Sequence, residues 1–263
     1  MDWLIDLRPL DDGMRSFEVT PPNDIVAAFG AYLLACAVRG AAENVEGMEL
    51  RALQAMFVAS ARGGPFRLEV EETASGASTS VRRVVIGRDA PCAVMTLAFR
   101  TTGEGTPDWQ GPSKAPMTAT PTSLGRYEPT ASGLTLVDLR PVDGAPPGYG
   151  RIHPVWARPA EPFGDGATAA AAAIALGSDQ FVIALAKTPD EDGPAFATTL
   201  DHSIWFHRPS HADEWLLYDA ELLTLAGRSC VARGTVHSAD GRLVASFVQG
   251  MLRRDWPRAA EWR

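Results

Sequence analysis

The sequence predicts an α+β fold made of two tandem copies of one unit, each a long central helix wrapped by an antiparallel sheet. The order of one helix and then four strands occurs twice along the chain. An offset of about 150 residues places Val81 on Val231 and Leu97 on Val248. This long period indicates a duplicated domain and excludes a solenoid.

A stretch rich in Pro, Gly, Ser and Thr separates the two copies and lacks sustained periodicity. We therefore expect an N-terminal domain at residues 1–104, a linker at 105–132 and a C-terminal domain at 133–263. Both flanking pieces are of ordinary domain size.

In the first copy, residues 25–44 are predicted to form the helix, because Val26, Phe29 and Leu33 recur at helical spacing. The sequence Pro22-Asn23-Asp24 precedes that run as a start signal. Four strands, separated by glycine-containing turns, are expected at residues 50–61, 65–73, 78–86 and 92–100.

In the second copy, the helix is predicted at residues 167–187. Two strands are expected before it and four after it, at residues 134–140, 151–158, 196–208, 214–225, 228–238 and 242–253. A long helix followed by such a meander can bury its apolar stripe only if the sheet wraps around it. Two such sheets can pair edge to edge, which also covers their exposed strand edges.

Composition excludes several classes of protein. The 24 Lys and Arg against 32 Asp and Glu give a net charge of -8, which repels phosphate backbones, so no nucleic-acid partner is expected. Acidic residues near the start argue against a secretory signal. The longest apolar run, residues 167–176, is too short for a membrane span, so we expect a soluble protein.

The 3 cysteines, Cys36, Cys92 and Cys230, are far apart and lack CxxC spacing. Neither a disulfide framework nor a thiolate zinc site is therefore expected, and a cytoplasmic location fits best.

Two polar residues fall on faces that are otherwise apolar. Asp179 lies on the predicted second helix in line with apolar neighbours such as Leu176 and Val182. Gln249 lies on the last strand in line with apolar residues such as Phe247. A buried carboxylate or amide is costly unless it is hydrogen-bonded or functional. Both residues also have a purely structural interpretation. Asp179 could be a helix-end residue with its side chain in water, and the Gln249 amide could satisfy a neighbouring backbone group at a sheet edge.

A third candidate is Thr199, whose strand face is polar. If the opposite face meets the helix, simple alternation points Thr199 away from Asp179 unless a bulge intervenes, and Thr198 would point inward instead. The nearby His202, His207 and His211 do not indicate a metal site. His202 and His207 are an odd number of residues apart on a strand, so they face opposite sides.

The second half carries a specific motif. TLDHSIWFHRP at residues 199–209 and DEWLLY at 213–218 resemble the C-terminal half of the acyl-CoA thioesterase II family, as do ARG at 232–234 and DGRLVAS at 240–246 running into VQG at 248–250. The first half resembles the family more weakly, chiefly at Phe29 and Gly30, which open the helix. Two departures are Ala31, where the family usually has Gly, and Gly250, where it usually has Glu.

The resemblance implies a double hotdog fold and hydrolysis of fatty acyl-CoA to a fatty acid and CoA, with no metal, cofactor or covalent intermediate. It assigns activation of the water to Asp179, Thr199 and Gln249. Strand alternation puts Asp201 on the same face as Thr199, so Asp201 is the next base to consider. It places substrate binding at Phe29 and Gly30, where a backbone amide at the helix N-terminus would stabilise the oxyanion. Pairing of whole chains into a homo-oligomer is also expected.

A rival hypothesis keeps the same fold without the chemistry: a non-hydrolytic acyl-CoA-binding or scaffold protein. The two hypotheses differ in whether Asp179, Thr199 and Gln249 converge on one site.

Overall fold

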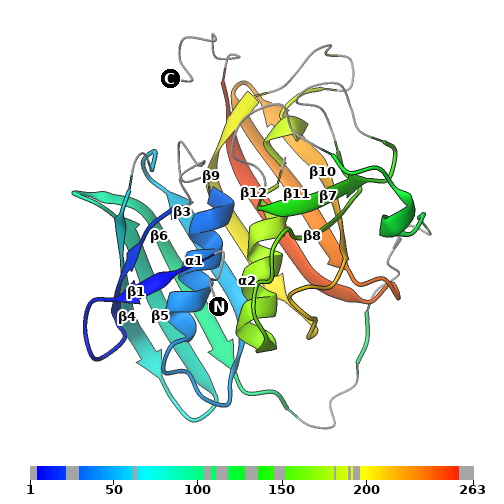
Figure 1. Ribbon diagram of the computed structural model, residues 1–263. Coiled ribbons are helices and arrows are strands. Elements are labelled where there is room, and N and C mark those ends of the chain that lie inside the picture. The colour runs from blue at the N-terminus through cyan, green and yellow to red at the C-terminus, as the bar shows by residue number, and fades with distance from the viewer. Residues whose placement is uncertain are drawn as a thin grey trace.

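The computed structural model describes residues 5–21, 30–61, 64–103, 108–110, 118–127, 136–144, 152–180, 182–188, 191 and 196–254. In this part of the chain a 12-stranded sheet carries two helices that lie side by side (Figure 1). All neighbouring strands given by the register are antiparallel. The predicted α+β architecture, with a central helix in each half, is confirmed.

The first half begins with two short strands, continues with a helix and ends with four antiparallel strands. The first of these four pairs with the last, and not with the second as in the predicted meander. Its elements are β1 (Leu7–Pro9), β2 (Ser16–Val19), α1 (Gly30–Ala42), β3 (Glu49–Phe57), β4 (Phe66–Ser75), β5 (Thr79–Gly87) and β6 (Pro91–Arg100).

The second half repeats this order after a 3-10 turn, η1 (Pro121–Ser123). Its elements are β7 (Val137–Pro141), β8 (Val155–Pro159), α2 (Gly166–Ser178), the 3-10 turn η2 (Val182–Leu185), β9 (Phe196–Phe206), β10 (Leu216–Ala226), β11 (Ser229–His237) and β12 (Leu243–Arg254).

The two halves meet where β3 pairs with β9 near the middle of the strand order β1-β2-β4-β5-β6-β3-β9-β12-β11-β10-β8-β7. The pairing runs from Ala52 opposite Trp205 to Met56 opposite Asp201. It brings α1 and α2 into contact, as Figure 1 shows. The buried residues consequently form one continuous core through both halves, and the predicted edge-to-edge pairing is present.

The duplication is visible in the irregularities of the sheet. The register of β4 against β5 shifts between Glu72 and Ala74, and that of β10 against β11 shifts between Leu222 and Thr224, 150 residues later. Likewise, Arg51 is the extra residue of β3 against β6, and Leu200 is the extra residue of β9 against β12. The short β1 and β2, which the sequence reading missed, complete the repeat by matching β7 and β8.

Both predicted helices need correction against the described residues. The second was expected to reach residue 187, but α2 ends at Ser178 and the apolar run continues as η2. Gly177, Ser178 and Asp179 are poor helix formers, and the Ser178 hydroxyl lies 3.0 Å from the Ala175 carbonyl of the preceding turn. The first helix was expected to reach residue 44, but α1, described as Gly30–Ala42, ends at Ala42. Positions 25–29 of its predicted range lie outside the described residues.

The segment Gly166–Leu185 is long and apolar enough to cross a membrane, with a hydropathy of 1.5, but 82% of that window is buried inside the protein. Here α2 contacts α1, β3, β8 and β11. An alanine-rich helix lets neighbouring elements approach closely, and this one occupies the place of a core helix.

Parts of the expected linker are fastened to the second half. The Trp156 indole donates to the Ala119 carbonyl at 3.1 Å, and the Gln110 side chain accepts from the Leu243 backbone N–H at 3.0 Å. These bonds hold described parts of residues 105–132 against β8 and β12.

Candidate functional site

Asp179 lies where the C-terminus of α2 meets the N-terminus of α1. It is the C-cap residue of α2, not a position within the helix as the sequence analysis expected, and its side chain is buried. The backbone N–H of Ala31, in the first turn of α1, donates to its carboxylate. The carboxylate therefore sits at the positive end of the α1 dipole, which favours its charged form.

Glycine is required at position 30 because α1 and Asp179 are so close. A Cβ there would lie 2.7 Å from Asp179 Oδ2 and 3.1 Å from Phe57 Cζ. The predicted substrate-binding residue Gly30 is thus in contact with the site. Its predicted partner Phe29 lies outside the described residues.

Thr199 reaches this carboxylate because β9 contains a bulge. Opposite β12, Asp201 pairs with Gly250 and Thr199 pairs with Met251, so Leu200 is the extra residue. The bulge reverses the alternation, and the Thr199 hydroxyl donates to Asp179 Oδ1 at 3.2 Å. Of the two open candidates, Thr199 faces Asp179.

Thr198 has a different neighbour: its hydroxyl accepts from Arg254 Nε at 3.4 Å. Asp201, the reserve base, was expected on the same face as Thr199, and this was wrong because the bulge separates them. The Asp201 carboxylate lies over Gly250, where an added Cβ would overlap it. The departure to Gly at position 250 therefore makes room for Asp201.

Gln249 faces inward from β12, as the alternation predicted, and is fully buried. Its Nε2 donates to Thr199 Oγ1 at 2.9 Å. Asp179, Thr199 and Gln249 are thus joined by two consecutive hydrogen bonds, although they come from three different elements. The structure brings the three sequence-predicted residues together.

The structure adds two residues, His202 and Ser178, that no sequence pattern had indicated as part of the site. His202 on β9 places Nδ1 2.9 Å from Gln249 Oε1 and Nε2 2.9 Å from the Ser178 hydroxyl. His202 is fully buried, whereas His207 is exposed, so they face opposite sides as predicted. The strand register could have identified His202, because pairing of β12 with β9 places His202 directly opposite Gln249.

Burial sets the charge states of the site. It raises the pKa of Asp179 to about 7, against the opposing effect of hydrogen bonds from Thr199, the Ala31 backbone and Gln249. Burial also lowers the pKa of His202 to about 4, so the imidazole is neutral at pH 7. The site thus combines a carboxyl that can exchange a proton near neutral pH with a neutral hydrogen-bonding histidine.

The matching positions of the first half contain only leucine. On the shared register of the two halves, Leu50 corresponds to Thr199, Leu53 to His202 and Leu97 to Gln249. The predicted match of Leu97 with Val248 was therefore wrong by one residue. All three leucines are buried. The fold therefore accepts apolar side chains at these positions, and the polar set in the second half is not needed to form the sheet.

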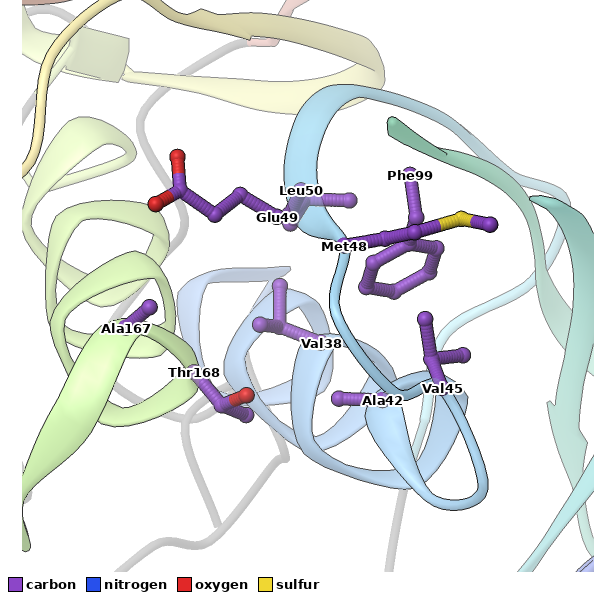
Figure 2. Close-up of a pocket in the computed structure, with 9 residues that line it drawn as sticks. All are labelled: Val38, Ala42, Val45, Met48, Glu49, Leu50, Phe99, Ala167 and Thr168. Carbon is purple, nitrogen blue, oxygen red and sulfur yellow. The ribbon is translucent and has the colours of Figure 1, made fainter. Parts of the chain in front are cut away.

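This matching region lies at the other end of the helix pair, where α1 ends and α2 begins. Figure 2 shows a hollow there, with Leu50 and Phe99 on the sheet side and Thr168 on α2. Its volume is about 20 Å³, close to that of one water-sized sphere. Among the described residues, the hydrogen-bonded set of Asp179, Thr199, Gln249 and His202 therefore lies only at the end of the helix pair where α2 ends and α1 begins.

Two helix-and-sheet units joined edge to edge, with their helices in contact, define a double hotdog protein. Comparison with family models gives the family. A model of the acyl-CoA thioesterase N-terminal domain matches residues 20–100, and one of the acyl-CoA thioesterase C-terminal domain matches residues 96–252. The chain belongs to the acyl-CoA thioesterase family and is an acyl-CoA thioester hydrolase.

Curated relatives agree with this assignment. Acyl-coenzyme A thioesterase 8 from Rattus norvegicus is 26% identical over 98% of this chain and 90% of its own length. Acyl-CoA thioesterase 2 from Haemophilus influenzae is 38% identical over 85 residues, or 30% of this chain.

Solved structures agree in fold. An acyl-CoA thioesterase II, TesB2, from Mycobacterium marinum has a TM-score of 0.72, with 24% identity and 97% of both chains covered. A putative thioesterase from Novosphingobium aromaticivorans has a TM-score of 0.77, with 23% identity and 95% of this chain and 98% of that chain covered.

The leucines of the first half lead to a stability prediction. Replacing His202 alone by Leu leaves the buried Gln249 oxygen without its partner and should cost about 1 to 3 kcal/mol of unfolding free energy. The double variant His202→Leu/Gln249→Leu, which copies Leu53 and Leu97, removes both partners and should cost less than the single variant. Denaturant unfolding of the parent, both single variants and the double variant measures this, and a double-variant loss equal to the sum of the single losses would contradict it.

Proposed function

We propose that this chain hydrolyses fatty acyl-CoA to a fatty acid and CoA, using a water molecule activated by Asp179 and positioned by Thr199 and Gln249. The observation that carries the proposal is the hydrogen-bonded chain of these three side chains, of which Asp179 and Gln249 are buried and Thr199 is half-buried. The strand positions that correspond to Thr199 and Gln249 hold leucines in the other half of the fold. Buried polar groups cost stability unless they serve a purpose, and here the purpose proposed is catalysis.

In the proposed reaction, the water oxygen attacks the thioester carbonyl carbon while Asp179 accepts a proton from the water. The tetrahedral intermediate then collapses: the carbon–sulfur bond breaks, and the departing CoA sulfur takes the proton back from Asp179. The overall change is thioester plus water to carboxylic acid plus thiol, so Asp179 is restored after each turnover.

Thr199 and Gln249 have a positioning role in this proposal. The Thr199 hydroxyl donates to Asp179 Oδ1, which leaves Oδ2, the oxygen close to Gly30, to accept the proton of the water. The carbonyl oxygen would lie against the N-terminus of α1 at Gly30, where a backbone amide and the helix dipole would stabilise a developing negative charge.

The alternative is a non-hydrolytic acyl-CoA-binding or scaffold protein on the same fold. An acyl chain can be bound without a carboxyl whose pKa lies near 7, so the environment of Asp179 favours hydrolysis. Release of free thiol from a panel of acyl-CoAs of different chain lengths separates the two proposals.

The first activity prediction concerns the base. Asp179→Asn keeps the size of the side chain and removes its basicity, so kcat should fall about 100-fold or more while KM changes little. The matched control is Asp201→Asn, whose carboxyl lies over Gly250 on the other face of the strand and which should stay within a few-fold of the parent. Thiol release by purified Asp179→Asn at the parent rate would exclude Asp179 as the base.

The second activity prediction concerns pH. A base must be ionised to act, and the pKa of Asp179 is raised to about 7, so kcat/KM should increase with pH through an acid limb centred near 7. Rates measured from pH 5 to 9 test this. An acid limb centred near the ordinary carboxyl value of 3.8 would contradict it.

The same raised pKa predicts a pH-dependent stability. Between 3.8 and about 7, folded Asp179 holds a proton that the unfolded chain releases, so its contribution to stability falls as pH rises through this window. Asp179→Asn should therefore gain stability relative to the parent on going from pH 4 to pH 8, by on the order of 1 to 4 kcal/mol. A difference in unfolding free energy that does not change between these two pH values would be the contrary result.

We also propose a cytoplasmic location and self-association of whole chains. Cys36, Cys92 and Cys230 are all free and buried, which supports a reducing compartment. Met56 of β3 and Trp205 of β9 expose 55% and 40% of their surface at the junction of the halves, which supports a second copy of the chain as the partner.

A further inference from the structure

We propose that His202 is a positioning residue: it fixes the orientation of the Gln249 amide and, through it, directs the Thr199 proton toward Asp179. The inference rests on the function proposed above and adds a residue to that site. It follows from four consecutive hydrogen-bond contacts that join Ser178, His202, Gln249, Thr199 and Asp179.

The donors in this chain of contacts are determined one after another. Gln249 Nε2 donates to Thr199 Oγ1, so Gln249 Oε1 is the atom that meets His202 Nδ1. An amide oxygen can only accept, which requires the hydrogen of His202 to be on Nδ1. In a neutral ring Nε2 then has only a lone pair. The single proton of the Ser178 hydroxyl, which lies 3.0 Å from the Ala175 carbonyl and 2.9 Å from Nε2, is therefore assigned to Nε2.

The other tautomer of His202 would disturb the site. With its hydrogen on Nε2, His202 would present a lone pair to Gln249, and the amide would have to turn over to donate to it. Gln249 would then offer its oxygen to Thr199. The single Thr199 proton would bond to Gln249 and no longer to Asp179, which would lose a donor to its charged form.

The His202 ring is held in place. It is fully buried and lies stacked on Phe247, with ring centroids 5.5 Å apart and an angle of 24° between the planes. Its two nitrogens contact different elements, Gln249 on β12 and Ser178 at the end of α2. Rotation of the ring would break both hydrogen bonds, so the Nδ1 hydrogen stays directed at Gln249.

The sheet itself does not call for histidine at this position. The corresponding residue of the first half is Leu53, which is fully buried on β3 and lies opposite Leu97 as His202 lies opposite Gln249. The histidine at this position is therefore explained by its hydrogen bond with Gln249, which in turn bonds to Thr199 and through it to Asp179.

Two substitutions separate the contacts of the ring. The amide nitrogen of Asn can take the place of Nδ1, so His202→Asn keeps a donor for Gln249 and loses the contact with Ser178. The longer side chain of Gln reaches the place of Nε2, so His202→Gln keeps the contact with Ser178 and loses the donor for Gln249. Each variant loses one buried hydrogen bond, so a purely structural role predicts similar losses of activity from both.

The proposal predicts different losses. In thiol-release assays, kcat of His202→Gln should fall about 10-fold to 100-fold with KM within about twofold of the parent. His202→Asn should stay within about threefold of the parent kcat. Ser178→Ala keeps the imidazole but removes the donor to Nε2, so the ring can carry its hydrogen on Nε2 part of the time, and kcat should fall about threefold to tenfold. This variant deletes one hydroxyl at a helix end and serves if either histidine variant folds poorly. Equal kcat for the parent, His202→Gln and Ser178→Ala would overturn the proposal.

A double variant tests whether His202 acts through Gln249. In the Gln249→Ala background, His202→Gln should lower kcat by less than twofold more, because the amide that His202 positions is gone. Independent, multiplicative losses would overturn the proposal. Gln249→Ala with the parent kcat would instead refute the proposed role of Gln249 in the reaction itself, so the two failures are distinguishable.

Discussion

The arrangement depends on one interaction, the contact of the Asp179 carboxylate at the end of α2 with the first turn of α1. That contact requires the two helices to touch, and they touch because β3 and β9 join the two halves into one sheet. Burial raises the pKa of Asp179 to about 7, and the Thr199 hydroxyl and the Ala31 amide limit the rise. The balance keeps a buried carboxyl able to ionise near neutral pH. Glycine at position 30 is part of the same constraint, because a larger residue would overlap the carboxylate.

Duplication gives an internal comparison of what the fold needs and what the site needs. The same bulges occur in both halves, so the backbone at Thr199 is shaped like the backbone at Leu50. Only the side chains differ: leucines in one half, and a hydrogen-bonded set that runs from Ser178 to Asp179 in the other. Since a well-packed apolar core is usually at least as stable as a buried polar network, the polar half gives up stability at the place where the reaction is proposed.

The sequence predicts the fold better than the site, for physical reasons that particular residues illustrate. Hydrophobic periodicity located the four long strands of each half and the central helices because it reports directly which face is buried. It also found the inward direction of Gln249. It did not give the strand order, in which β3 pairs with β6 and β9 with β12. It did not find the end of α2, where Gly177 and Ser178 stop the helix within an apolar run, nor the short β1 and β2. The bulge at Leu200 arises from pairing with β12, which no local pattern encodes, so Thr199 could be chosen only through the family motif. His202 was set aside because its role depends on neighbours that lie far away in the sequence.

The measurement that tests the central claim most directly is the titration of the Asp179 carboxyl in the folded protein. Carbon-13 NMR of protein labelled at its aspartate carboxyls, with Asp179→Asn used to assign the signal, would follow this group without any substrate. The account predicts one carboxyl that titrates near pH 7 and is missing from the spectrum of Asp179→Asn. An Asp179 signal that titrates near the ordinary value of 3.8 would contradict it.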